Sequence, residues 1–89
     1  MKSIIIIVEG HVQGVFFRSH VEKEAKELKL VGYVRNLNDG NVEIGVEGSE
    51  EKIKEFVKFC KSNPGSSKVE SIKIKDKKME GFDSFMIKY

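Results

Sequence analysis

Cysteine, proline and tryptophan are nearly absent from this sequence of 89 residues, which contains one cysteine, one proline and no tryptophan. The single cysteine, Cys60, cannot form an internal disulfide, which favours a reducing compartment, and it excludes a metal site built from several thiolates. Long hydrophobic runs are absent too. The apolar run Ile4–Val8 ends at Glu9, and it is too short for a signal peptide or a membrane span. We therefore expect a cytoplasmic protein without a membrane partner.

Strong net charge is also missing. Sixteen basic and 14 acidic side chains leave a formal charge of +2, so no strong field attracts nucleic acid. Arginine is scarce as well, because Arg18 and Arg35 are the only two and the other 14 basic residues are lysines. A guanidinium is preferred where two oxygens are bound in one plane, which marks these two positions as candidates for such binding. The alternative is that a lysine-rich composition contains only two arginines by chance.

Hydrophobic periodicity predicts five strands and two helices in a single domain spanning residues 1–89. The strands are expected at residues 3–9, 31–37, 42–47, 68–76 and 85–89, and the helices at residues 18–30 and 50–62. Asp39-Gly40 predicts a hairpin turn, and Ser49 is the expected N-cap of the second helix. Right-handed crossovers then favour an α+β, ferredoxin-like βαββαβ sandwich with an extra C-terminal strand. Both helices should cover one face of a mostly antiparallel sheet.

A loop joins the first strand to the first helix through the segment G-H-V-Q-G-V-F-F-R at residues 10–18. Such a turn directs backbone N–H groups at whatever lies above it, and a helix N-terminus is partially positive. Two glycines allow a tight turn, and Arg18 adds a fork of donors that fits two phosphate oxygens. The chemistry is that of a cradle for a phosphate or a carboxylate. The segment matches neither G-x-x-x-x-G-K-[ST] nor G-x-G-x-x-G, so an ordinary turn is the alternative.

A second polar position, Asn36, lies near the end of the second predicted strand. In a split β-α-β unit the first and second strands run parallel, so their ends open at the same edge of the sheet. Arg18 and Asn36 can then converge on one ligand. The alternative is that Asn36 only caps the turn that follows it.

These two segments carry a resemblance to a known family. The segment at residues 10–18 resembles the first signature of the acylphosphatases, and G-Y-V-R-N-L-N-D-G-N-V-E-I-G-V-E-G at residues 32–48 resembles their second signature. Chain length and element order are similar too, whereas the family's proline-rich stretch is only partly present at residues 63–67. The resemblance implies a monomeric hydrolase without metal or organic cofactor, which cleaves the carboxyl–phosphate bond of acyl phosphates to a carboxylate and inorganic phosphate.

The resemblance also implies the site residues. In the family, the arginine that matches Arg18 binds the phosphate together with the loop's N–H groups, and the asparagine that matches Asn36 positions the attacking water. The expected phosphate-binding loop comprises His11, Val12, Gln13, Gly14, Val15, Phe16, Phe17 and Arg18. Its four apolar side chains are expected to pack against the fold and hold the loop rigid. His11 is expected to be a partly exposed loop residue, with contact to phosphate as the alternative.

Two other functions are compatible with this fold class. An RNA-binding module needs exposed aromatic residues on the central strands and a basic surface, but residues 4–8 and 42–46 include no aromatic side chain. A regulatory domain would bind an acyl or carbamoyl phosphate without turnover, and the presence of Arg18 and Asn36 favours turnover instead. Cys60 falls on the apolar stripe of the second helix, where it is expected to be a small core residue.

Overall fold

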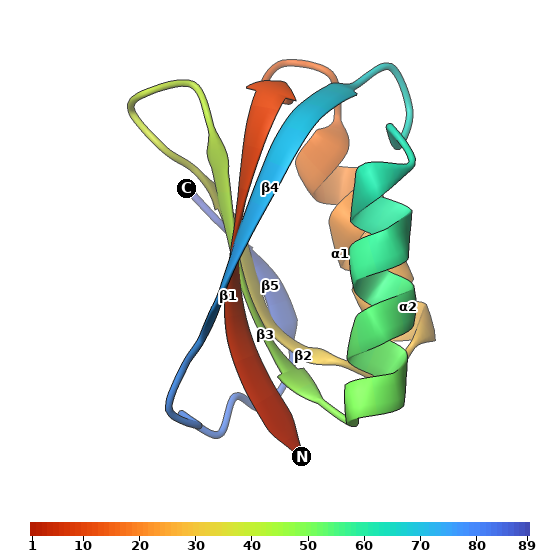
Figure 1. The fold of residues 1–89 in the computed structure, drawn as a ribbon, viewed down its shortest axis with the longest axis vertical. Helices are drawn as coiled ribbons and strands as arrows, with labels where there is room; N and C mark the ends of the chain where they lie inside the picture. The colour runs from red at the N-terminus through yellow and green to blue at the C-terminus, as the bar shows by residue number, and fades with distance from the viewer.

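The computed structural model describes residues 1–89 and contains a five-stranded sheet with two helices packed on one face (Figure 1). The strands are β1 (Lys2–His11), β2 (Val31–Asn36), β3 (Val42–Gly48), β4 (Lys68–Asp76) and β5 (Phe85–Lys88). The helices are α1 (Phe17–Glu27) and α2 (Glu50–Lys61). The strand order across the sheet is β4-β1-β3-β2-β5. The predicted ferredoxin-like α+β sandwich with an extra C-terminal strand is confirmed.

Strand pairing brings the ends of β1 and β2 to the same edge of the sheet. Both strands pair antiparallel with β3, one on each side of it, so they run parallel to one another. Val42, at the start of β3, is paired with Val8 on one side and with Asn36 on the other. The loop that leaves β1 and the last residue of β2 therefore lie near one another. β5 runs parallel to β2 and forms the neighbouring edge of the sheet.

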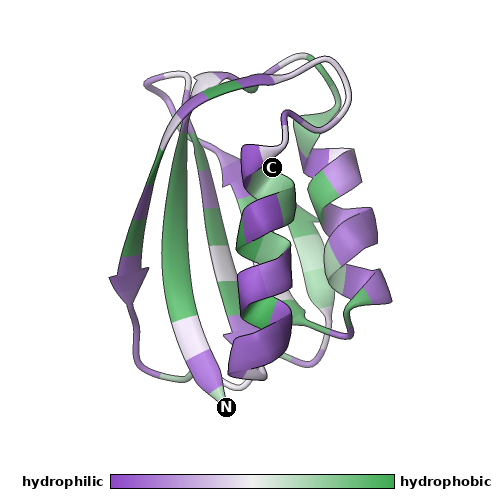
Figure 2. Cartoon of the chain, turned by 45° about the vertical axis from the view of Figure 1, so that its right-hand side comes forward, coloured by the Kyte–Doolittle hydropathy of each residue, from purple (hydrophilic) through white to green (hydrophobic).

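The hydrophobic core fills the space between the sheet and the helices. Strand residues that point toward the helices are fully buried, as the alternating set Val42, Ile44 and Val46 shows. The helices contribute Phe17, Val21, Ala25, Ile53, Phe56 and Cys60. Figure 2 shows the matching colours, with hydrophobic green along β1, the strand that follows the N-terminus, and hydrophilic purple on the outward turns of the helices. The predicted core position of Cys60 is confirmed, and its burial raises the pKa of the thiol to about 12.

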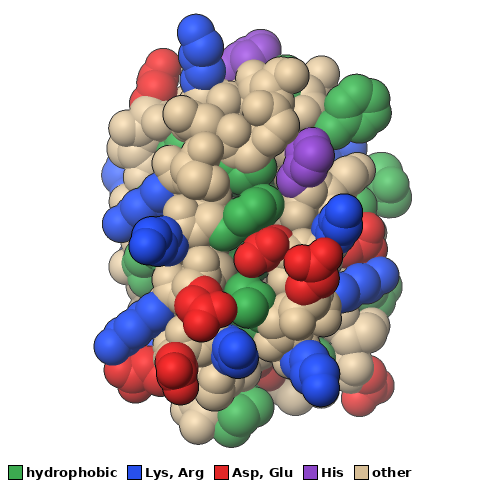
Figure 3. All heavy atoms as spheres, turned by 90° about the vertical axis from the view of Figure 1, so that its right-hand side faces the viewer, with side chains coloured by type: hydrophobic (Ala, Val, Ile, Leu, Met, Phe, Trp, Pro, Cys, Tyr) green, Lys and Arg blue, Asp and Glu red, His purple; other side chains and the backbone are tan.

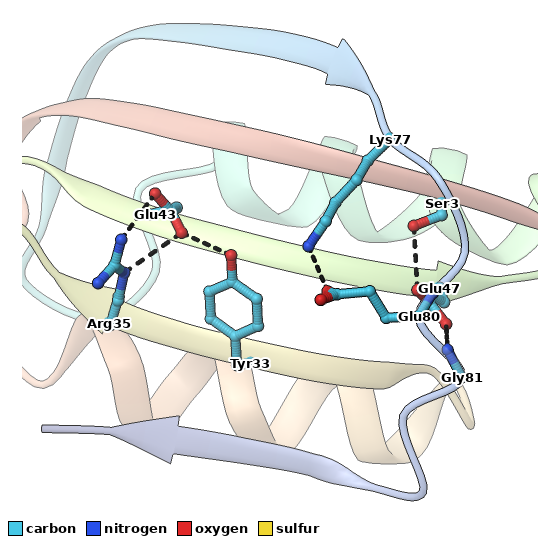
Figure 4. Close-up of polar contacts among 8 residues, drawn as sticks. All are labelled: Ser3, Tyr33, Arg35, Glu43, Glu47, Lys77, Glu80 and Gly81. Atoms are coloured by element: carbon cyan, nitrogen blue, oxygen red, sulfur yellow. Dashed lines mark hydrogen bonds and ion pairs between the residues drawn. The ribbon is translucent and has the colours of Figure 1, made fainter.

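The face of the sheet that is turned away from the helices carries a polar cluster (Figure 4). The hydroxyl of Tyr33 donates to Oε2 of Glu43 at 2.5 Å, and Arg35 donates to both oxygens of the same carboxylate at 3.2 and 3.3 Å. Burial acts to raise the pKa of Glu43, but the hydrogen bonds from Tyr33 and Arg35 outweigh it and hold that pKa below its usual value. Arg35 thus binds two oxygens in one plane, as the scarcity of arginine suggests. The carboxylate that it binds, however, is Glu43 of the same chain and not that of a ligand.

A buried carboxylate holds the connection between β4 and β5 against the end of the sheet. Glu47 is 1% exposed, and it accepts hydrogen bonds from the hydroxyl of Ser3 and from the N–H groups of Glu80 and Gly81 at 3.1, 2.7 and 3.0 Å (Figure 4). Burial opposes ionisation of Glu47, but these donors prevail and lower its pKa.

The end of the first strand differs from the prediction. β1 continues through Gly10 and His11, which pair with Val69 and Lys68 of β4 after a bulge at Glu9. Gly10 adopts φ 137°, and a Cβ there would lie 2.2 Å from the carbonyl oxygen of Lys68. The glycine is therefore required by the close approach of β4, and the predicted loop begins two residues later than expected.

The end of the first helix also differs from the prediction. α1 ends at Glu27, because Lys29 adopts φ 58° and the N–H of Leu30 donates back to the carbonyl oxygen of Ala25 at 2.9 Å. This pattern is the helix stop that glycine usually makes, and here a lysine makes it. At the start of α2, Ser49 caps the N–H of Lys52 as predicted.

Charges on the outer face of the helices are mixed. Figure 3 shows blue Lys and Arg side chains interspersed with red Asp and Glu side chains over this face, with no region of one sign.

Candidate active site

Residues 12–16 connect β1 to α1, and their backbone N–H groups have no partner within the chain. None of these five groups donates to a backbone or side-chain acceptor, and the first N–H groups of α1 have no acceptor in the preceding turn of the helix. The first turn of α1 also contains no acidic side chain. The loop therefore presents a set of free donors at the partially positive end of a helix, which is an arrangement that binds anions.

The loop is anchored from below by apolar side chains. Val12 and Phe17 are each 1% exposed, and Val15 packs against the core from a partly buried position. Gly14 has φ 73° and no atom within 4 Å of the place where a Cβ would lie, so its backbone is open to a ligand. Phe16 is 77% exposed. The expectation that it packs inside the fold is therefore wrong, because its left-handed backbone (φ 60°, ψ 21°) directs the side chain outward.

A side-chain amide ties the loop to the turn between β2 and β3. Nε2 of Gln13 donates to the carbonyl oxygens of Leu37 and Asn41, both at 2.8 Å. That turn is itself braced by Asp39, which accepts from the N–H and the side-chain amide of Asn41. Residue spacing predicts Gln13 only as a member of the loop and does not indicate this cross-link.

A cavity of about 280 Å³ lies above the loop and brings the two predicted polar residues together. It is lined by Val12, Gly14, Phe16, Phe17, Arg18, Ser19, Asn36, Ile87 and Tyr89. Arg18 and Asn36 thus face one space, as predicted, and Asn36 is the exposed last residue of β2. His11, Gln13 and Val15 belong to the predicted loop but do not line the cavity. His11 is an exposed residue of β1 beside β4, so the expectation that it is a loop residue is wrong.

The guanidinium of Arg18 is held by the C-terminal strand and the residue after it. Nη1 of Arg18 donates to the carbonyl oxygen of Lys88 at 3.4 Å, and Cζ lies 4.9 Å from the centre of the Tyr89 ring. Attraction between a cation and an aromatic ring favours this stacked position. Ile87 and Tyr89 were predicted only as strand residues. Their place beside Arg18 depends on β5 pairing with β2, which residue spacing does not reveal.

Arg18 is the only charged side chain that lines the cavity. No His, Asp, Glu or Lys side chain is available there to transfer a proton, so the site offers fixed positive charge and hydrogen-bond donors instead. The structure contains no group of three or more His, Cys, Asp or Glu residues that could hold a metal ion. None of its helices is both long and apolar enough to cross a membrane.

Two features define the class of protein: a ferredoxin-like sandwich, and a loop with free N–H groups beside a cavity that an arginine and an asparagine line. The acylphosphatase family model matches residues 4–87. The chain therefore belongs to the acylphosphatase family, and the resemblance drawn from its two motifs is confirmed.

Relatives support this assignment over nearly the whole chain. The acylphosphatase of Bacillus licheniformis is 48% identical over 94% of this chain and 94% of its own length. The crystal structure of the acylphosphatase from Bacillus subtilis matches with a TM-score of 0.97 and 43% identity, and each chain is covered completely. The structure of an acylphosphatase from Coxiella burnetii matches with a TM-score of 0.93 and 33% identity, over 98% of this chain and 92% of that one.

Proposed function

We propose that this protein hydrolyses the carboxyl–phosphate bond of acyl phosphates and releases a carboxylate and inorganic phosphate. Membership of the acylphosphatase family supports the reaction class. The observation that carries the proposal is that Arg18, Asn36 and the open backbone of Gly14 line the same cavity. Two polar side chains from separate elements and a set of free N–H groups are thereby directed at one small anion.

The phosphoryl group would be bound by Arg18 and the loop together. A transferred phosphoryl group spreads its negative charge over three equatorial oxygens, so catalysis is mostly positioning and electrostatic stabilisation. The guanidinium of Arg18 would donate to two oxygens at once, and the free N–H groups of the loop residues that line the cavity, Val12, Gly14 and Phe16, would donate to the rest. Because Lys88 and Tyr89 hold the guanidinium, little reorganisation is needed when the substrate binds.

The attacking water would be oriented by Asn36. A side-chain amide can donate and accept hydrogen bonds but cannot remove a proton near neutral pH. In the proposed step, the water oxygen bonds to phosphorus as the bond between phosphorus and the carboxyl oxygen breaks, and a phosphate oxygen accepts the water proton. The carboxylate leaves without protonation, because its pKa is only about 4. This accounts for a cavity that no His, Asp, Glu or Lys side chain lines.

The proposal is tested by measuring hydrolysis of benzoyl phosphate in the presence of EDTA. Wild type should turn over many times, and Arg18→Ala and Asn36→Ala should each lower kcat/KM by about a hundredfold or more, the scale for losing one transition-state donor. Arg35→Ala and Asn38→Ala are matched controls, because they remove the same residue types outside the cavity.

Three results would argue against the proposal. Phosphate binding without turnover by the wild-type protein would leave a regulatory acyl-phosphate-binding domain. Loss of turnover on adding EDTA would contradict the metal-free step. A rate–pH profile that requires an enzyme base near neutrality would exclude the phosphate as the proton acceptor.

A further inference from the structure

Phe16 is a large apolar side chain that contributes nothing to the fold's core. It is 77% exposed, and it occupies the N-cap position of α1 without making a side-chain capping bond. Its backbone has φ 60° and ψ 21°, a left-handed conformation that is strained for a bulky residue. Strain of this kind persists where the surrounding structure enforces it, and it clusters at functional sites. The position therefore calls for an explanation outside folding.

The exposed ring of Phe16 lines the same cavity as Arg18. Two further apolar side chains line that cavity from the C-terminal strand, namely Ile87 and the fully exposed Tyr89. Tyr89 also stacks on the guanidinium of Arg18, but the side chains of Phe16 and Ile87 have no part in binding a phosphate, since the charge and the donors come from Arg18 and the loop backbone. Apolar surface left exposed beside a polar site is typical of ligand contact.

The geometry of an acyl phosphate indicates what this apolar surface contacts. The acyl carbon is joined to phosphorus through a single oxygen, so the acyl group begins at the edge of the phosphate cradle and extends toward solvent. Gly14, Arg18 and Phe16 line one cavity, and Phe16 is 77% exposed, so an acyl group that leaves the phosphate toward solvent has an apolar side chain beside it. Aromatic rings gain most when they meet another planar apolar group.

We infer that Phe16 determines acyl-group selectivity by packing against the body of the acyl group, and that it favours aromatic acyl phosphates over small aliphatic ones. This inference rests on the proposed function and adds a substrate class to it. Arg18 and Asn36 act on the phosphate, which all acyl phosphates share, whereas Phe16 contacts the acyl group, which differs between them.

The test compares benzoyl phosphate with acetyl phosphate in wild type and Phe16→Ala. The two substrates differ in leaving-group basicity, but that difference cancels when each ratio of kcat/KM is compared between the two proteins. Phe16→Ala should lower the ratio of benzoyl to acetyl kcat/KM about fivefold, the scale of one aromatic contact, with most of the change in KM for benzoyl phosphate. Phe59→Ala, which removes a phenylalanine of α2 outside the cavity, should keep the wild-type ratio. An unchanged ratio in Phe16→Ala would overturn the inference.

A binding measurement keeps the test decisive if Phe16→Ala fails to fold. The wild-type protein is titrated with two unreactive phosphonates in which a CH₂ replaces the bridging oxygen, one carrying a phenyl ketone and the other a methyl ketone. Wild type should bind the phenyl ketone several times more tightly, and equal dissociation constants would overturn the inference. If wild type hydrolyses neither acyl phosphate, the proposed function fails. The dissociation constants of the two phosphonates still measure the selectivity of the cavity, because they do not depend on turnover.

Discussion

Replacing Gln13 with alanine should destabilise the fold and disturb the active site, because this side chain joins the loop between β1 and α1 to the turn between β2 and β3. Its amide nitrogen donates to the carbonyl oxygens of Leu37 and Asn41 at 2.8 Å each. A hydrogen bond of this kind contributes about 0.5–1.5 kcal/mol, so losing both removes about 1–3 kcal/mol. The lower half of that range applies, because Gln13 is only half-buried and water can replace its amide. We therefore expect Gln13→Ala to lower the free energy of unfolding by about 1–2 kcal/mol.

Gln13→Ala should also slow catalysis. The loop carries the proposed phosphate donors, and the turn that Gln13 reaches follows directly after Asn36. The two hydrogen bonds therefore fix the loop relative to Asn36. Misplacing reacting groups by about 1 Å lowers rates by about a hundredfold, and a partial loss of position should lower kcat/KM for benzoyl phosphate by about tenfold.

Gln13→Glu sharpens this test, because a carboxylate has nearly the same shape but cannot donate to a carbonyl oxygen. It should be at least as damaging as alanine in chemical unfolding and in steady-state kinetics at pH 7. Wild-type stability and wild-type kcat/KM in both variants would refute the reasoning. A loss of stability without any loss of kcat/KM would refute the positioning role alone.

Three further predictions concern the frame around the site. The pKa of Glu47 is lowered in the folded state. The ionised carboxylate therefore stabilises the fold above its unfolded pKa of about 4.5, and this stabilisation is lost as pH falls through the folded pKa. Below pH 5, the urea midpoint of Glu47→Gln should fall less steeply with pH than that of wild type. Gly10→Ala should destabilise the protein by about 2 kcal/mol or more, because its φ of 137° and the carbonyl of Lys68 leave no room for a Cβ, and thermal unfolding would measure it. Cys60 is fully buried, so its thiol should react with a thiol reagent only at the rate of unfolding, and immediate labelling of the folded protein would contradict its placement.

The elements that alternate or repeat regularly were predictable from the sequence. Val42, Ile44 and Val46 alternate with Glu43, Gly45 and Glu47 and are buried as that pattern requires, although Gly45 and Glu47, which the pattern predicts on the solvent side, are buried as well. Ser49 marks the start of α2, and its cap is present. Each of these signals is local, so neighbouring residues contain all of the information that the prediction needs.

The features that sequence reasoning missed all depend on contacts between distant segments. Gly10 was assigned to the ligand-binding loop, but the approach of β4 determines its conformation. Lys29 ends α1 in a position that glycine usually takes, so no residue type signalled the stop. Gln13 reaches across to the turn after β2, and no spacing rule relates those positions.

The candidate site was predictable in its polar residues and not in its apolar ones. Arg18 and Asn36 were identified from motif and topology, and they line the same cavity. Phe16 was expected inside the fold because it is apolar, but backbone conformation decides its direction. Tyr89 reaches Arg18 only because β5 pairs with β2. Hydrophobicity alone does not separate a core residue from one that faces a substrate.

We propose that Arg18 binds the phosphate and that Asn36 positions the water. Measuring the phosphate affinity of a variant of each residue separates these two roles. An NMR titration with inorganic phosphate should be run on wild type, Arg18→Ala and Asn36→Ala, the two variants with lowered turnover. The account predicts that Asn36→Ala binds phosphate nearly as tightly as wild type, whereas Arg18→Ala loses most of its affinity. Equal loss of phosphate affinity in both variants, or wild-type affinity in Arg18→Ala, would contradict the account.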